Sequence, residues 1–111
     1  GSKVLVLGIT FKENCPDIRN SRVIDVINEF KSYNCNVDVY DPWADFDEVK
    51  EEYDIELIKS KNVLETYNAI VAAVAHQEFD ELRLNQYSKD DKTVVYDIKG
   101  VLPKDRVDAR L

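Results

Sequence analysis

The sequence lacks any long apolar segment and contains little cysteine or histidine. None of its apolar runs approaches the roughly 20 residues that a membrane-spanning helix needs. The first run, at residues 4–7, is also too short for the core of a secretory signal peptide. Two cysteines, Cys15 and Cys35, form no paired framework, which predicts a reducing compartment and a cytoplasmic protein. The single histidine, His76, has no cysteine at ligand spacing, so no metal site is predicted.

Basic residues are also in short supply, with 15 Lys and Arg against 22 Asp and Glu and a net charge of −7. Because nucleic-acid binding rests on basic surface that neutralises phosphates, this balance argues against a nucleic-acid partner. The net charge does not exclude a small anionic ligand, because charges beyond about 8–10 Å are screened. The binding of such a ligand depends on the charges close to it. The other proportions, 44% hydrophobic and 33% charged, are those of an ordinary globular domain, and 111 residues suffice for one core.

Glycine is scarce where a dinucleotide-binding turn would require it. The first apolar run ends at Gly8, and no second or third glycine follows before the next helical segment. Those glycines let the backbone approach a pyrophosphate at the helix N-terminus. Asp41 follows the second apolar run, where a dinucleotide fold places its ribose-binding acid, but without the glycines it is weak evidence. We expect instead a strand-ending turn at Asp41-Pro42, in which the carboxylate accepts local backbone N–H groups.

Apolar runs that predict strands alternate with segments of helical periodicity. In residues 23–33 the apolar positions recur at i, i+3, i+4 and i+7, Ser21 is placed to cap this helix, and Asn34 suits its exit. The strand runs are near-continuous, as expected of parallel strands covered on both faces. The alternation predicts an α/β fold, a Rossmann-like three-layer sandwich with a mostly parallel sheet. The predicted strands are residues 4–7, 37–40, 69–74 and 94–96, with a weaker one at 55–58, and shorter helices are predicted at 45–53, 62–67 and 77–82.

A long polar loop, residues 11–21, separates the first strand from the first helix. Such a loop opens at the carboxyl edge of a parallel sheet, where open α/β folds bind ligands. It holds Phe11, Lys12 and Arg19 within nine residues. An aromatic face can stack on a base, and two cations can meet phosphates. The loop therefore predicts a site for an anionic ligand with a flat ring.

The same loop carries a resemblance to a known family. Phe-Lys at 11–12 and Asp-Ile-Arg-Asn-Ser at 17–21, with Val-Tyr-Asp-Pro at 39–42, resemble the C-terminal, UDP-binding domain of the UDP-glucose/GDP-mannose dehydrogenase family. Residues 41–45 and 73–76 are most similar to its UDP-N-acetylhexosamine branch. The resemblance covers residues 3–111, one domain, whereas residues 1–2 look like a cloning scar.

The resemblance implies one part of an NAD-dependent UDP-sugar 6-dehydrogenase, which oxidises the C6 alcohol to a carboxylate for surface polysaccharide precursors. NAD would be bound mainly by an N-terminal domain outside this chain, and the full-length enzyme is expected to be a homo-oligomer. This chain would supply uridine diphosphate contacts and close the cleft against the N-terminal and central domains. It lacks the Gly-rich motif of the family's nucleophilic cysteine, and Cys15 is no substitute, so the chain alone is expected to be inactive.

Four residues take binding roles from the resemblance. Phe11 and Lys12 would line the UDP-sugar site, although their spacing alone fits a half-buried aromatic and a solvated lysine. Arg19 would contact NAD across the domain cleft, and without the resemblance it is equally a salt-bridge partner for Asp17 or Glu29. Lys99 would be a further substrate contact. It stands where many members have an arginine and keeps the charge but not the bidentate fork, so an ordinary surface lysine is the alternative.

The alternative hypothesis for the chain is a stand-alone flavodoxin-like interaction module, such as a phosphoacceptor receiver. Such a module needs clustered acids after the first strand and an acceptor aspartate at the end of the third. Here Gly-Ile-Thr at 8–10 and Ala-His at 75–76 occupy those places, which disfavours that module. His76 itself, at the end of the third strand, is expected to cap or order a loop.

Overall fold

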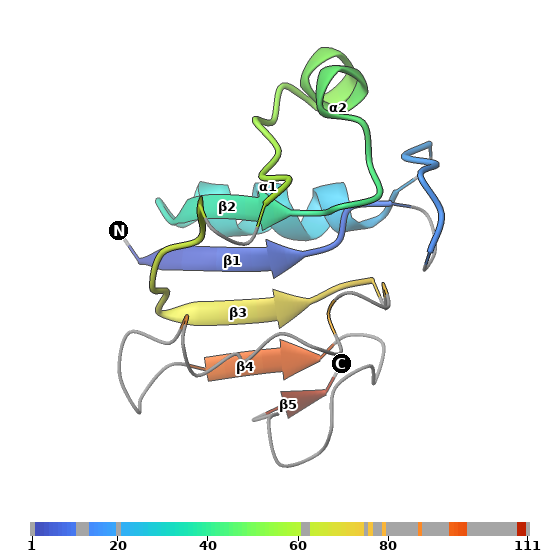
Figure 1. Cartoon of the computed structure of the whole chain (residues 1–111). Coiled ribbons are helices and arrows are strands. Elements are labelled where there is room, and N and C mark those ends of the chain that lie inside the picture. Colours follow the sequence, from blue (N-terminus) through green and yellow to red (C-terminus); the bar gives the residue numbers. More distant parts are fainter. Residues whose placement is uncertain are drawn as a thin grey trace.

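The computed structural model of the chain describes residues 2–10, 14–19, 21–60, 63–74, 76, 79, 87, 94–97 and 109–110. Within these residues a single sheet has the strand order β2-β1-β3-β4-β5, and every neighbouring pair is parallel (Figure 1). Because all strands run the same way, their carboxyl ends lie at one edge. The strands are β1 Lys3–Leu7, β2 Asn36–Tyr40, β3 Ala69–Ala72, β4 Val94–Asp97 and β5 Ala109–Arg110.

Two helices accompany β2, one before it and one after it. Helix α1, Val23–Ser32, buries Val23 and Ile27 one turn apart, and its partly buried Ile24, Val26 and Phe30 pack against the same cluster. Helix α2, Phe46–Tyr53, begins at Asp45, whose carboxylate accepts the Glu48 N–H at 3.0 Å. It ends at Asp54 in the left-handed region, with φ of 56°.

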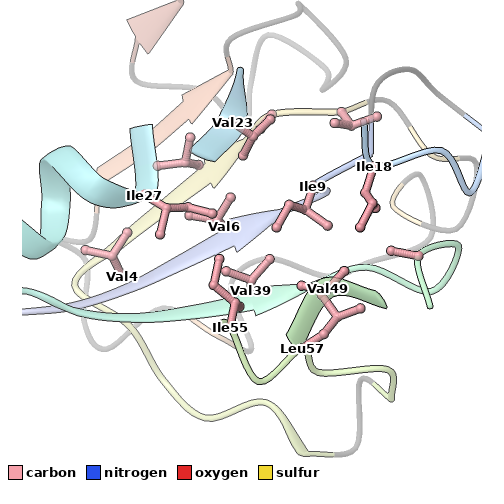
Figure 2. Packing of buried hydrophobic residues seen from close by; sticks show 14 residues of the cluster. Val4, Val6, Ile9, Ile18, Val23, Ile27, Val39, Val49, Ile55 and Leu57 are labelled. Carbon is pink, nitrogen blue, oxygen red and sulfur yellow. The ribbon is translucent and has the colours of Figure 1, made fainter. Parts of the chain in front are cut away.

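The sheet separates two apolar clusters, because successive side chains of a strand point to opposite faces. On one face Val4 and Val6 of β1 pack with residues of α1 and of the segment around α2 (Figure 2). On the other, Leu5 and Leu7 pack with Tyr67 and Phe79. These four side chains of β1 are at most 1% exposed, so β1 is the central strand of the core.

The predicted α/β, Rossmann-like fold with a parallel sheet is confirmed. The helices predicted at 23–33 and 45–53 agree with α1 and α2 to within one residue at each end. Asn34 has the expected positive φ of 62°. The helix predicted at 77–82 lies outside the described residues apart from Phe79, and so does most of the chain between β3 and β4 on which a third layer depends.

Three local predictions were wrong, and one strand was not predicted. Residues 55–58 make one isolated bridge, Tyr40 to Ile58, because Ile55 and Leu57 are committed to the core instead of to a strand ladder. Residues 62–67 form no α-helix where the structure describes them. There the Tyr67 N–H bonds the Tyr87 carbonyl.

The other two errors concern a helix cap and a strand. Ser21 does not cap α1: the capping position is Arg22, without a side-chain bond, and the buried Ser21 Oγ has no hydrogen-bond partner among the described residues. The short strand β5 was missed, because two residues, Ala109 and Arg110, form no apolar run.

The chain passes close to itself where β1 leaves the sheet, at Gly8. Gly8 has φ of +95°, and a Cβ built on it would lie 2.5 Å from the Val74 Cβ. The Gly8 N–H bonds the Tyr40 carbonyl at 2.9 Å, so this backbone cannot move away freely. The loop after β1 therefore starts with a backbone conformation and a close approach that only glycine permits.

We expect Gly8→Ala to lower the free energy of unfolding by about 1–3 kcal/mol, because the added methyl overpacks against Val74 in an unfavourable backbone region. Asn34→Ala is the matched control, since Asn34 also has a positive φ but is exposed. It should cost clearly less in urea denaturation. Equal losses in the two variants would mean that φ alone, and not the contact with Val74, requires glycine.

Candidate functional site

Three loops leave the sheet side by side at its carboxyl edge, after β1, β2 and β3 (Figure 1). Their first described residues, 8–10, 41–44, 73, 74 and 76, are mostly buried. Thr10, Asp41 and His76 are the buried polar residues of the described chain, and each comes from a different loop. The polar groups of the interior are thus gathered where this fold class binds ligands.

The Asp41 carboxylate holds the three loops together. Its side chain is fully buried, and it accepts five hydrogen bonds from groups in all three segments. An ionised carboxylate offers about four lone-pair positions, so both of its oxygens are fully used. Oδ2 accepts from the backbone N–H groups of Ile9 (2.7 Å) and Thr10 (3.3 Å) and from His76 Nε2 (2.9 Å). Oδ1 accepts from the backbone N–H groups of Trp43 (2.7 Å) and Ala44 (3.1 Å).

These donors keep Asp41 ionised. Burial acts to raise the pKa of the Asp41 carboxyl, but the hydrogen bonds from His76 and from the Ile9 and Trp43 backbone outweigh burial and hold the pKa below its usual value. The expected strand-ending turn at Asp41 is therefore confirmed. Its carboxylate reaches further than expected, since it also binds the loop that follows β1. The Lys59 ammonium adds to the turn from outside by donating to the Pro42 and Ala44 carbonyls.

His76 joins the same network through both ring nitrogens. Nδ1 accepts the Asn14 N–H at 2.9 Å, so Nδ1 carries no hydrogen and the ring proton is on Nε2. Nε2 lies 2.9 Å from Asp41 Oδ2 and 3.0 Å from Thr10 Oγ1. The Trp43 ring stacks on the imidazole at a centroid distance of 6.0 Å. The loop-ordering role expected of His76 is confirmed, although its partners could not be named from the sequence.

Three of the four predicted binding residues, Phe11, Lys12 and Lys99, lie outside the described residues. Their neighbours in the chain are described. Phe11 and Lys12 fall between Thr10 and Asn14, which both bond to His76. Strand β4 ends at Asp97, in register with Ala72, so Lys99 follows a strand that ends at the same edge.

Arg19 is the one predicted binding residue that the structure describes. Its side chain is 84% exposed and forms a bidentate pair with Asp17, with Nε and Nη2 each 3.0 Å from a carboxylate oxygen. The Arg19 N–H also donates to Asp17, at 2.9 Å. This is the salt bridge that the sequence left open as an alternative, and the NAD contact remains a prediction. An exposed pair of this kind can exchange partners at little cost.

An open groove of about 620 Å³ lies next to Arg19, between the loop that precedes α1 and helix α2. Its lining includes Glu48, Glu51 and Glu52 together with Tyr53, whose hydroxyl donates to the Ile18 carbonyl at 2.6 Å. Three carboxylates against one arginine do not suit a phosphate group. We therefore separate this groove from the candidate site at the sheet edge.

Other kinds of site find no support among the described residues. No group of three or more His, Cys, Asp or Glu side chains there could hold a metal ion. In the same part of the chain no helix has the length and apolarity to cross a membrane. Cys15 and Cys35 are free and half-buried.

Comparison with known proteins places the chain in a family. A family model described as the UDP-glucose/GDP-mannose dehydrogenase family, UDP binding domain, matches residues 5–104. The chain is 50% identical to a UDP-N-acetyl-D-glucosamine 6-dehydrogenase of Salmonella typhi and 42% identical to one of Pseudomonas aeruginosa. Each alignment covers 100% of this chain but 26% of the relative, so the chain spans about a quarter of the length of these curated relatives.

The fold agrees with solved structures. The UDP-N-acetyl-mannosamine dehydrogenase Cap5O of S. aureus superimposes with a TM-score of 0.73 at 24% identity, over 99% of this chain and 25% of that protein. A UDP-D-ManNAc dehydrogenase of Pyrococcus horikoshii gives a TM-score of 0.75 at 21% identity. At these identities the likeness concerns the fold alone.

Asp41→Asn should lower the free energy of unfolding by about 1.5–3 kcal/mol at neutral pH, because an amide cannot accept from all five donors. The pKa of Asp41 is lowered on folding, so its stabilisation is present above the unfolded pKa and is lost as pH falls through the folded value. The difference between wild type and variant should therefore shrink below about pH 4.

Urea denaturation over a pH series measures this difference. The control is Asp45→Asn at the exposed start of α2, where asparagine is an equally good helix cap and little change is expected. A difference between wild type and Asp41→Asn that does not vary with pH would contradict an ionised, hydrogen-bonded Asp41.

Proposed function

Since this chain belongs to the UDP-binding domain of the UDP-glucose/GDP-mannose dehydrogenase family, we propose that it binds the uridine diphosphate part of a UDP-sugar at the carboxyl edge of its sheet. The observation that supports this most is the anchoring of the loop after β1. The residues on either side of 11–13, Thr10 and Asn14, are both hydrogen-bonded to the buried His76 ring. Phe11 and Lys12 would then meet the ligand from between two anchored neighbours.

The nucleotide contacts combine two kinds of interaction. The Phe11 ring would exclude water beside the ligand, and the Lys12 ammonium would act as a point charge on it. Lys99 would add a second cation from the loop after β4, which starts at the same edge. Local cations can hold an anion although the chain has a net charge of −7, because distant charges are screened.

The enzyme containing this chain would be an NAD-dependent UDP-sugar 6-dehydrogenase that oxidises the C6 alcohol to a carboxylate and supplies precursors of surface polysaccharides. The names of the two relatives favour a UDP-N-acetylhexosamine as substrate. We place this enzyme in the cytoplasm and expect it to act as a homo-oligomer, with this chain packed against its N-terminal and central domains. The chain alone would carry out no oxidation.

NAD does not fit the described residues as a self-contained site. Among the described residues the turn after β1 contains one glycine, Gly8, and its backbone packs closely against Val74. Asp41, at the position of a ribose-binding acid, already accepts five hydrogen bonds and has no oxygen left for a ribose hydroxyl. The proposal therefore assigns the main NAD site to the rest of the enzyme, with Arg19 reaching it from this chain.

Calorimetric titration of the full-length enzyme with UDP tests the nucleotide site. Lys12→Ala and Lys99→Ala should each weaken binding, and Lys99→Arg should preserve or strengthen it, because arginine restores a bidentate fork. The losses should fade as salt rises. Lys3→Ala is the control: it removes the same charge at the opposite edge, where Lys3 begins β1 and pairs with Glu65. Unchanged affinity in both alanine variants would place the nucleotide elsewhere.

Arg19→Ala in the full-length enzyme should raise the KM for NAD by about tenfold or more, the effect of losing a charge-assisted hydrogen bond to a phosphate. The KM for the UDP-sugar should change far less. Arg22→Ala, an exposed arginine at the start of α1, is the control and should leave both constants unchanged. Equal effects on the two KM values, or no effect on either, would mean that Arg19 serves only in the salt bridge with Asp17.

A further inference from the structure

A single imidazole contacts both ends of the loop that carries Phe11 and Lys12. Before the loop, Thr10 Oγ1 lies 3.0 Å from His76 Nε2. After it, the Asn14 N–H donates to His76 Nδ1 at 2.9 Å. Thr10 and Asn14 are separated by three residues in the chain. His76 is 66 and 62 residues away from them, so the contact is entirely tertiary.

The imidazole is itself held in place from several sides. It is fully buried, and Asp41 Oδ2 lies 2.9 Å from Nε2. Trp43 stacks on one side of the ring at an interplanar angle of 22°, and Phe79 meets it edge-on at 5.4 Å. A ring with these neighbours cannot change its rotamer without opening the core.

The two ring nitrogens have different roles because of where the proton is. Nδ1 accepts from the Asn14 backbone, and Nε2 carries the hydrogen next to the Asp41 carboxylate. Asp41 thereby sets the tautomer that lets Nδ1 act as an acceptor. Asn14 reaches Nδ1 with a positive φ of 51°, an unusual backbone conformation that this bond helps to hold.

We infer that His76 is a positioning residue for nucleotide binding: its Nδ1 fixes Asn14 while Asp41 fixes the ring, so that a residue next to the loop that carries Phe11 and Lys12 is held in place. This inference rests on the proposed function, which assigns Phe11 and Lys12 to the ligand. A loop whose two ends are held before the ligand arrives has less conformational entropy to lose on binding. His76 thus acts on affinity without touching the nucleotide.

Two substitutions separate the contacts of the ring. His76→Asn places a carbonyl oxygen near the position of Nδ1, so it can still accept the Asn14 N–H but loses the contact with Asp41. His76→Gln places its amide nitrogen near the position of Nε2, so it keeps the contact with Asp41 but loses the acceptor for Asn14. Both variants remove a buried aromatic ring next to Trp43, and both are expected to lower the melting temperature.

The experiment is calorimetric titration of the full-length enzyme with UDP, accompanied by the melting temperature of each variant. His76→Gln should weaken UDP binding by about tenfold, because Asn14 is then no longer held before the ligand arrives, and His76→Asn by less than about threefold. Tyr67→Phe is the control. It removes the partly buried hydrogen bond from the Tyr67 hydroxyl to Asp38 (2.6 Å), which lies away from the loop. It should lower the melting temperature without changing UDP affinity.

Several outcomes would overturn the inference. If the Gln and Asn variants lose the same affinity, or if affinity simply follows melting temperature across all variants including Tyr67→Phe, His76 supports the fold alone. If Lys12→Ala weakens UDP binding while both His76 variants bind normally, the positioning role fails and the proposed function stands. If the wild-type enzyme does not bind UDP, both fail.

A measurement on the unaltered chain guards against variants that do not fold. Long-range proton–nitrogen NMR spectra of the 111-residue chain should show the His76 hydrogen on Nε2, and the Asn14 amide should exchange slowly with solvent. A hydrogen on Nδ1, or a rapidly exchanging Asn14 amide, would overturn the inference without any substitution.

Discussion

The carboxylate of Asp41 is the interaction on which the candidate site depends. A charge with no exposure to solvent is tolerated in a protein only when it is paired and hydrogen-bonded. Here the donors come from the loops after β1, β2 and β3, so the requirement to satisfy one buried anion brings three chain segments together. The edge of the sheet is shaped by this requirement before any ligand is bound.

The same constraint separates this domain from an ordinary dinucleotide-binding fold. In such a fold the acid after β2 faces a ribose and the glycines after β1 admit a pyrophosphate. In this chain the acid is turned inward to the protein's own N–H groups, and Gly8 serves a close contact with Val74 instead. One sheet topology thus supports a different use of its edge, and in the function proposed here the loop after β1 presents side chains to the ligand.

The sequence predicted the parallel α/β fold because β1, β2 and β3 are apolar and α1 has a clear helical period. It also predicted the Asp41 turn, because an aspartate followed by proline at a strand end has a local mechanism. It could not predict that His76 meets Asn14, because that contact depends on how β3 lies beside β1. The helix predicted at residues 62–67 failed for a related reason. Tyr67 packs in the second apolar cluster, and its N–H bonds the Tyr87 carbonyl.

The central claim is that UDP binds at the carboxyl edge, on the loop anchored by Asp41 and His76. Hydrogen–deuterium exchange of the full-length enzyme, with and without UDP and in the absence of NAD, tests it most directly. The account predicts that UDP slows exchange in peptides covering residues 9–14, while peptides of α2 along the acidic groove stay unchanged. Protection confined to α2 and the groove, with none at residues 9–14, would contradict it.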